Sequence, residues 1–152
     1  MVTITPVTRD DLDALFALTV GASQEGFVAP NTKSLAEIAY LPGAYAFAIR
    51  HDDLIVGLMG IVDCREYDAL GSGDDPNAAF LMRLMIGEEF QRRGHGRAAM
   101  QLALTWAKSR QNSCFQTSFV PENAGAALFY ASLGLQKTGR IVADEIEMSI
   151  DL

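Results

Sequence analysis

A glycine-rich turn, Gln91-Arg92-Arg93-Gly94-His95-Gly96, places the strongest constraint on the fold of this chain. The residues before it, 80–86, form an apolar run that predicts a buried strand, and residues 96–110 have the apolar spacing of a helix. Glycine permits backbone conformations that other residues avoid, and it lets another group approach the main chain closely. The turn therefore predicts a buried strand that passes through a tight loop into a helix.

The patterns that follow and precede this turn predict a mixed sheet. Residues 114–120 form another apolar strand after the helix, so strands 80–86 and 114–120 should be parallel neighbours joined by a right-handed crossover. Antiparallel pairs are expected on both sides of this unit, formed by residues 44–50 with 54–62 and by residues 135–140 with 145–150. The predicted fold class is therefore α/β (α+β).

The N-terminal segment predicts a strand and two helices. A strand at residues 3–7 precedes Thr8 and Asp11, which resemble a capping box at the start of a helix. The apolar face of that helix is expected to carry Leu12, Leu15, Phe16 and Thr19. Residues 21–30 contain turn formers and should line a surface opening, after which Ser34 is expected to cap a short second helix.

Size and composition narrow the class of protein. The 152 residues fit one domain, 1–152, and 49% hydrophobic with 20% charged residues is ordinary globular usage. A net charge of −7 argues against nucleic-acid binding and suits a cationic substrate. No run approaches the roughly 18 apolar residues of a spanning helix, and no leader is recognisable, so neither membrane nor secretion is expected. Cys64 and Cys114 stand singly, which predicts reduced thiols and a cytoplasmic protein.

The glycine turn also predicts an anion site. A helix N-terminus presents free N–H groups and the positive end of a dipole, and Arg92, Arg93 and Arg97 concentrate positive charge there. Residues 94–99 satisfy the loose G-x-G-x-x-A pattern of dinucleotide folds, but no acidic residue follows until Glu122. A nucleoside triphosphate loop would require Lys followed by Ser or Thr, which is absent. Two interpretations remain, a pyrophosphate of another cofactor class and a glycine-rich turn that only enters an ordinary helix.

The turn resembles the cofactor motif of the GNAT acetyltransferases, Q/R-x-x-G-x-G/A, through Gln91, Gly94 and Gly96. The positions of Asn123 and Tyr130 agree with this family, and residues 80–100 resemble its bacterial spermine/spermidine branch. The resemblance implies a mixed, mostly antiparallel sheet of about six or seven strands, with helices on both faces and a central parallel pair. It also implies acetyl-CoA as the cofactor and makes a homodimer an expectation.

The resemblance assigns roles to particular residues. Backbone groups of Leu84, Met85 and Ile86 would pair with the pantetheine arm, and the pyrophosphate and its surroundings would involve Gln91, Arg92, Arg93, Gly94, His95, Gly96, Arg97 and Asn123. Asn123 and Tyr130 are seven residues apart, which places them on nearly the same face of a helix. Family members commonly use a tyrosine at this position to protonate the coenzyme thiolate, so Tyr130 is the predicted general acid. The alternative is a packing tyrosine whose hydroxyl is tied to the backbone.

The general base and the acceptor stay open at this stage. Where several polyamine-acetylating relatives carry a glutamate, the strand reads Leu81-Met82-Arg83-Leu84, and Arg83 is expected to pair with a carboxylate or to orient a substrate. Acidic residues that could bind a substrate amine or relay its proton through water are Glu25, Asp63 and Glu66. The two histidines lack the spacing of a metal site, so no metal is expected. The predicted acceptor is a small primary amine such as a polyamine or diamine; a peptide or lysine acceptor, and a non-catalytic acyl-CoA-binding module, are the alternatives.

Overall fold

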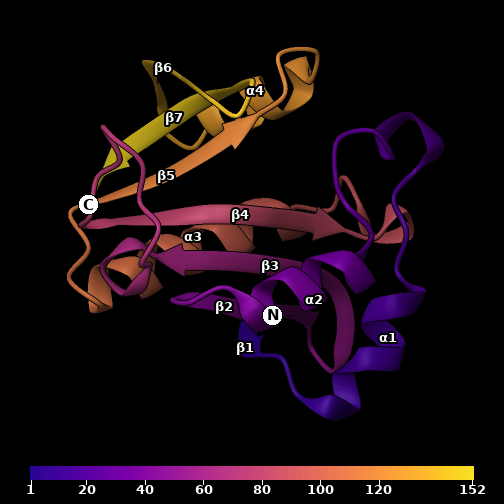
Figure 1. The fold of residues 1–152 in the computed structure, drawn as a ribbon. Helices are drawn as coiled ribbons and strands as arrows, with labels where there is room; N and C mark the ends of the chain where they lie inside the picture. Colours follow the sequence, from indigo (N-terminus) through magenta and orange to yellow (C-terminus); the bar gives the residue numbers. More distant parts are fainter.

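The computed structural model describes residues 1–152, which form one seven-stranded sheet (Figure 1). The strands are β1 (Val2–Pro6), β2 (Ala44–His51), β3 (Leu54–Asp63), β4 (Ala78–Ile86), β5 (Cys114–Phe119), β6 (Gln136–Val142) and β7 (Glu145–Asp151). They lie in the order β1-β2-β3-β4-β5-β7-β6, and every neighbouring pair is antiparallel except β4 and β5. The predicted mixed sheet with its parallel pair is therefore confirmed.

Helices cover both faces of this sheet. They are α1 (Leu12–Ala17), α2 (Asn31–Tyr40), α3 (His95–Ser109) and α4 (Ala124–Ala131). Figure 1 shows α1 and α2 on the near face and α3 on the far face, where α3 makes the crossover from β4 to β5. None of these helices combines the length and the apolar character that crossing a bilayer requires.

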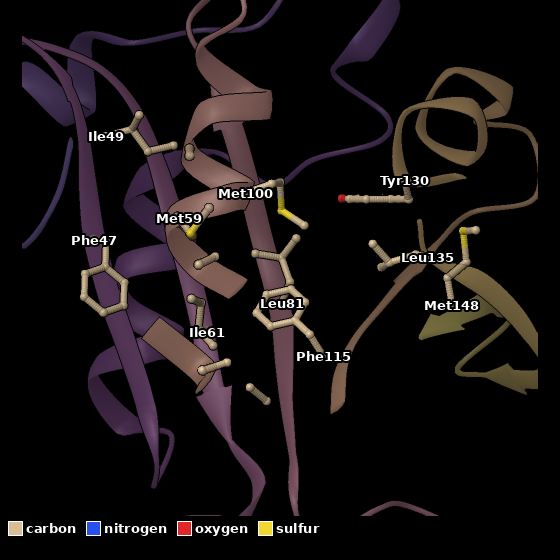
Figure 2. Packing of buried hydrophobic residues seen from close by; sticks show 14 of the residues in the cluster. Phe47, Ile49, Met59, Ile61, Leu81, Met100, Phe115, Tyr130, Leu135 and Met148 are labelled. Atoms are coloured by element: carbon tan, nitrogen blue, oxygen red, sulfur yellow. The ribbon is translucent and has the colours of Figure 1, made fainter. Parts of the chain in front are cut away.

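The main core lies between the sheet and α3, and it continues beneath α4. Met59, Leu81, Met100 and Phe115 are almost completely buried there, as Figure 2 shows. Tyr130 extends from α4 toward the same cluster. A smaller cluster on the opposite face joins α1 to the sheet through Leu15, Leu18, Leu58 and Met85. Because both faces of β4 are packed, its apolar run is explained by burial rather than by alternation.

A β-bulge in β4 decides which residues face which layer. Gly60 of β3 pairs with Arg83 and Ile61 pairs with Leu81, so Met82 is an extra residue in β4. The bulge reverses the alternation along β4: Leu81 packs in the core with α3, whereas Arg83 turns to α2 and its Nη2 donates to Glu37 Oε2 at 2.7 Å. The expected pairing of Arg83 with a carboxylate is confirmed.

The N-terminal helices differ from the sequence predictions in detail. Thr8 N–H donates to Asp11 Oδ2 at 2.9 Å, as the capping box predicted, but α1 ends before Thr19. The prediction that Ser34 caps the second helix is wrong. That helix begins at Asn31, whose side-chain amide donates to the Leu15 carbonyl oxygen at 2.8 Å, and Ser34 N–H already bonds within the first turn. A tertiary hydrogen bond therefore sets the start of α2.

Candidate functional site

A cleft of about 1140 Å³ opens where β4 and β5 separate. The two strands pair in parallel only from Ala78 with Cys114 to Leu81 with Thr117. Beyond that point β5 diverges from β4, as Figure 1 shows, and residues 83–86 pair with β3 alone. The β5-facing edge of this segment therefore presents main-chain groups without a strand partner, to which an extended ligand can bond.

The segment before α2 closes one side of this cleft. It includes a 3-10 turn, Ala22–Gln24, and the side chains of Gln24, Phe27 and Val28 line the opening. The prediction that residues 21–30 line a surface opening is confirmed by these contacts. Gln91 connects this segment to β4, because its Nε2 donates to Gln24 Oε1 at 2.8 Å and to the Ile86 carbonyl oxygen at 2.9 Å. The side chain of Gln91 thus fixes the shape of the loop.

The N-terminus of α3 also lines the cleft. Gly94 occupies the N-cap with φ of 83°, a left-handed conformation that glycine adopts readily. The first main-chain hydrogen bond of the helix runs from Ala98 N–H to the Gly94 carbonyl oxygen, so the preceding N–H groups have no acceptor within the helix. Those N–H groups and the helix dipole suit a phosphate group. The N-terminus of α3 therefore has the geometry that an anionic group could bind.

The arginines of this loop lie in different settings. Arg92 and Arg97 line the cleft and Arg93 does not. Arg97 Nη2 donates to Ser132 Oγ at 2.7 Å and so ties α3 to the end of α4. His95 lines the cleft but is 6% exposed, and its ring lies 4.9 Å from that of His51 between centroids. Burial lowers the pKa of His95, and the neighbouring His51 acts in the same direction, which favours the neutral ring.

Tyr130 and Asn123 reach the cleft from α4, as their helical spacing predicted. Asn123 is the N-cap, and its Oδ1 accepts from Ala126 N–H at 3.0 Å. Figure 2 shows the Tyr130 hydroxyl pointing from α4 toward β4. Burial raises the pKa of Tyr130, while the neighbouring Thr117 hydroxyl acts in the opposite direction. A buried phenol with a raised pKa keeps its proton and can donate it.

The three acidic residues predicted to bind a substrate do not line this cleft. Asp63 and Glu66 lie near the end of β3 that pairs with the start of β4, away from the separated ends of β4 and β5. Asp63 is completely buried and accepts from Arg110 Nε at 2.8 Å, and Glu66 forms an ion pair with the same arginine. Glu25 neighbours Gln24 but is exposed and not part of the cleft wall.

The charges around Asp63 form a structural network instead. Burial alone would raise the pKa of Asp63, but hydrogen bonds from Arg65, Arg110 and Asn112 outweigh it and hold the pKa far below its ordinary value. The Arg110 guanidinium also lies over the rings of Tyr45 and Trp106, at 4.9 and 5.0 Å from their centroids. The Asp63 carboxylate is thus bonded to three protein side chains, those of Arg65, Arg110 and Asn112.

Two polar residues of the cleft carried no functional signal in the sequence. Glu145, at the start of β7, lines the cleft and its Oε2 accepts from Ser118 Oγ of β5 at 2.5 Å. The two residues are distant in sequence and meet because β5 pairs with β7. Only the alternation along the predicted strand 114–120 could have indicated that Ser118 and Thr117 face opposite sides.

Comparisons with known proteins agree with this arrangement. A family model described as Acetyltransferase (GNAT) family matches residues 12–135, which is more than half of the chain. No curated protein matches the sequence. The family match includes the cleft walls from α1 to α4 together with the glycine loop.

Solved structures share the fold over nearly the whole chain. Aminoglycoside acetyltransferase AAC(6')-Ib in complex with coenzyme A has a TM-score of 0.80 at 14% identity, covering 99% of this chain and 95% of that one. PaiA N-acetyltransferase from Thermoplasma acidophilum, also with coenzyme A, has a TM-score of 0.73 at 16% identity, covering 100% and 99%. The ribosomal-protein-S18-alanine N-acetyltransferase from Escherichia coli has a TM-score of 0.69 at 18% identity, covering 99% and 94%. At these identities the similarity shows a common fold.

Proposed function

Because this chain belongs to the acetyltransferase (GNAT) family and is an acetyl-CoA-dependent N-acetyltransferase, we propose that it acetylates a small primary amine in the cleft between β4 and β5. The observation that carries the proposal is the coincidence of three features at one opening. The α3 N-terminus with Gly94 offers free N–H groups, residues 82–86 offer an unpaired strand edge, and Tyr130 offers a buried phenol. Together these features match a ligand with an anionic end, an extended arm and a reactive thioester.

The chain's own groups suit each part of acetyl-CoA. We assign the pyrophosphate to the main-chain N–H groups of the loop 91–97, with Arg92 beside them, and the pantetheine arm to the backbone of Leu84, Met85 and Ile86. When bound, acetyl-CoA supplies an acetyl group activated as a thioester. Arg93 does not line the cleft, so its contribution would be limited to long-range attraction of the phosphates.

Tyr130 is the proposed general acid. Its raised pKa keeps the phenol protonated at neutral pH, which a proton donor to a departing thiolate requires. The Thr117 side chain neighbours Tyr130. Its Oγ1 donates to the Leu81 carbonyl oxygen at 3.1 Å, and this hydrogen bond orients the Thr117 hydroxyl. Tyr130 belongs to the hydrophobic core and also lines the cleft, which supports a role beyond packing.

The acceptor is proposed to be a primary amine, with polyamines and diamines among the candidates. The likeness of residues 80–100 to spermine/spermidine acetyltransferases supports that class, and the acidic composition suits a cation. Proteins of the same fold are described as aminoglycoside and ribosomal-protein-alanine acetyltransferases, so a sugar amine or a peptide N-terminus is the alternative. The buried free thiols of Cys64 and Cys114 support a cytoplasmic site of action. A homodimer is the proposed assembly.

The test is an acceptor panel with acetyl-CoA, in which products are identified by mass spectrometry. The panel should contain monoamines, polyamines, amino acids, aminoglycosides and peptides with free N-termini. We expect an N-acetylated product from at least one amine class, and none when acetyl-CoA is omitted. Tight acetyl-CoA binding without any acetylated product would instead favour the non-catalytic acyl-CoA-binding module.

A further inference from the structure

Glu145 is the only carboxylate among the residues that line the cleft. The other charged side chains of the wall are arginines, so Glu145 is the one place where a cationic group meets a negative charge. Its hydrogen bond to Ser118 Oγ, at 2.5 Å, fixes the position of the carboxylate between β5 and β7. A carboxylate held in this way can bind an ammonium group and accept a proton from it.

The alternation of β5 places Glu145 and Tyr130 on opposite sides of the opening. Thr117 is buried on the face that carries α3 and α4, where Tyr130 neighbours it. Ser118 therefore points to the other face, and Glu145 is bonded to it there. Arg83 points to that same face, because its partner Glu37 belongs to α2. A proton acceptor on one side and a proton donor on the other is the arrangement that direct attack on a thioester requires.

We propose that Glu145 binds the acceptor's ammonium group and acts as its general base, with Ser118 as the positioning residue. This inference rests on the proposed function. Glu145 takes one proton from R–NH3⁺, and the freed electron pair of the nitrogen forms the N–C bond to the acetyl carbon. The C–S bond breaks, its electron pair goes to sulfur, and the Tyr130 proton is transferred to that sulfur. The second nitrogen proton returns through water to the Tyr130 oxygen, and Glu145 releases its proton to solvent.

The same observation narrows the acceptor class. Glu145 is one carboxylate and can pair with one ammonium group. Two nearby acids do not line the cleft and are bonded elsewhere, Glu37 to Arg83 and Glu147 to Arg140. The second ammonium of a polyamine would meet the Arg83 side of the cleft, where no free carboxylate lines the wall. Among primary amines, the enzyme should therefore prefer acceptors that carry no second positive charge near the reacting amine.

The experiment compares the pH dependence of kcat/KM for the wild type, Glu145→Gln and Asp144→Asn. Asp144 precedes Glu145, does not line the cleft, and has a φ of 65° that asparagine tolerates, so Asp144→Asn removes an equal charge from the same turn. We expect Glu145→Gln to lower kcat/KM by about 100-fold near neutral pH and the control to leave it unchanged. The titratable and charged groups that line the opening besides Glu145 are Tyr130, Arg83, Arg92, Arg97 and His95.

Two further measurements separate a catalytic role from a merely structural one. Glu145→Gln should recover as the pH rises, because a larger fraction of the amine is then neutral and needs no base. It should also weaken acceptor binding measured by calorimetry in the presence of coenzyme A. Ser118→Ala keeps the Glu145 carboxylate, so we expect a smaller loss of kcat/KM and a shift of the acidic limb of its pH profile. This variant tests the proposal if Glu145→Gln does not fold.

The outcomes distinguish the two levels of the proposal. An active wild type beside a Glu145→Gln enzyme with unchanged kcat/KM and pH profile would overturn the role of Glu145 and leave the acetyltransferase proposal standing. A wild type that acetylates no amine would overturn both. Preference for a polyamine over a matched monoamine would contradict the narrowed acceptor class.

Discussion

Replacing Arg110 with methionine should destabilise the fold without altering the cleft. Asp63 is fully buried, and Arg110 supplies one of its two guanidinium partners. Removing one partner of a buried ion pair costs about 3–5 kcal/mol, and we expect the lower end because Arg65 still binds Asp63. Loss of the charge over Tyr45 and Trp106 adds about 0.5–1 kcal/mol for each ring, partly offset by methionine packing. The expected total is about 3–4 kcal/mol.

Urea unfolding measures this cost directly. With a slope of about 2 kcal/mol/M, the midpoint should fall by roughly 1.5–2 M, whereas Lys108→Met in the last turn of α3 should change stability by less than about 0.5 kcal/mol. Because the folded pKa of Asp63 is depressed, its stabilising contribution is present above the unfolded pKa of about 3.9 and is lost below it. The difference in the free energy of unfolding between the wild type and Arg110→Met should therefore decrease at acidic pH. A loss below about 1 kcal/mol at neutral pH would refute the reasoning.

The cleft and the α3 N-terminus give two further predictions. Tyr130→Phe should lower kcat by about 100-fold while leaving acetyl-CoA affinity in calorimetry nearly unchanged, and wild-type turnover in a folded variant would exclude the acid role. Burial depresses the pKa of His95, so stability should be complete above the unfolded pKa of about 6.5 and should fall as the pH drops below it. His95→Gln should make the melting temperature in thermal unfolding scans depend less steeply on pH. The same pH dependence in both proteins would show that His95 does not cause the loss of stability at low pH.

The elements around the glycine loop were predictable because their signals are local. An apolar strand, a glycine pair and a periodic helix follow one another within about 30 residues, and that succession fixes a parallel crossover. The helical spacing of Asn123 and Tyr130 likewise placed both side chains at one opening. Local patterns also identified the hairpin of β2 and β3.

The remaining features depend on contacts between distant segments. The start of α2 is fixed by Asn31 bonding to the Leu15 carbonyl oxygen, which no capping pattern reveals. The direction of Arg83 depends on a bulge in register with Gly60 of β3. Glu145 reaches the cleft through the pairing of β7 with β5, whereas Asp63 is withdrawn into a network of arginines. Sequence alone could therefore count the acidic residues without identifying the one that faces the opening.

Amine-dependent release of coenzyme A thiol from acetyl-CoA, compared between the wild type and Gly94→Glu, tests the central claim most directly. The variant places a bulky, negatively charged side chain at the left-handed N-cap of α3, where the pyrophosphate is proposed to bind. We predict release by the wild type that requires an amine, and loss of both release and acetyl-CoA binding in a variant that circular dichroism shows to be folded. Equal acetyl-CoA binding by the two proteins, or no binding by the wild type, would contradict the account.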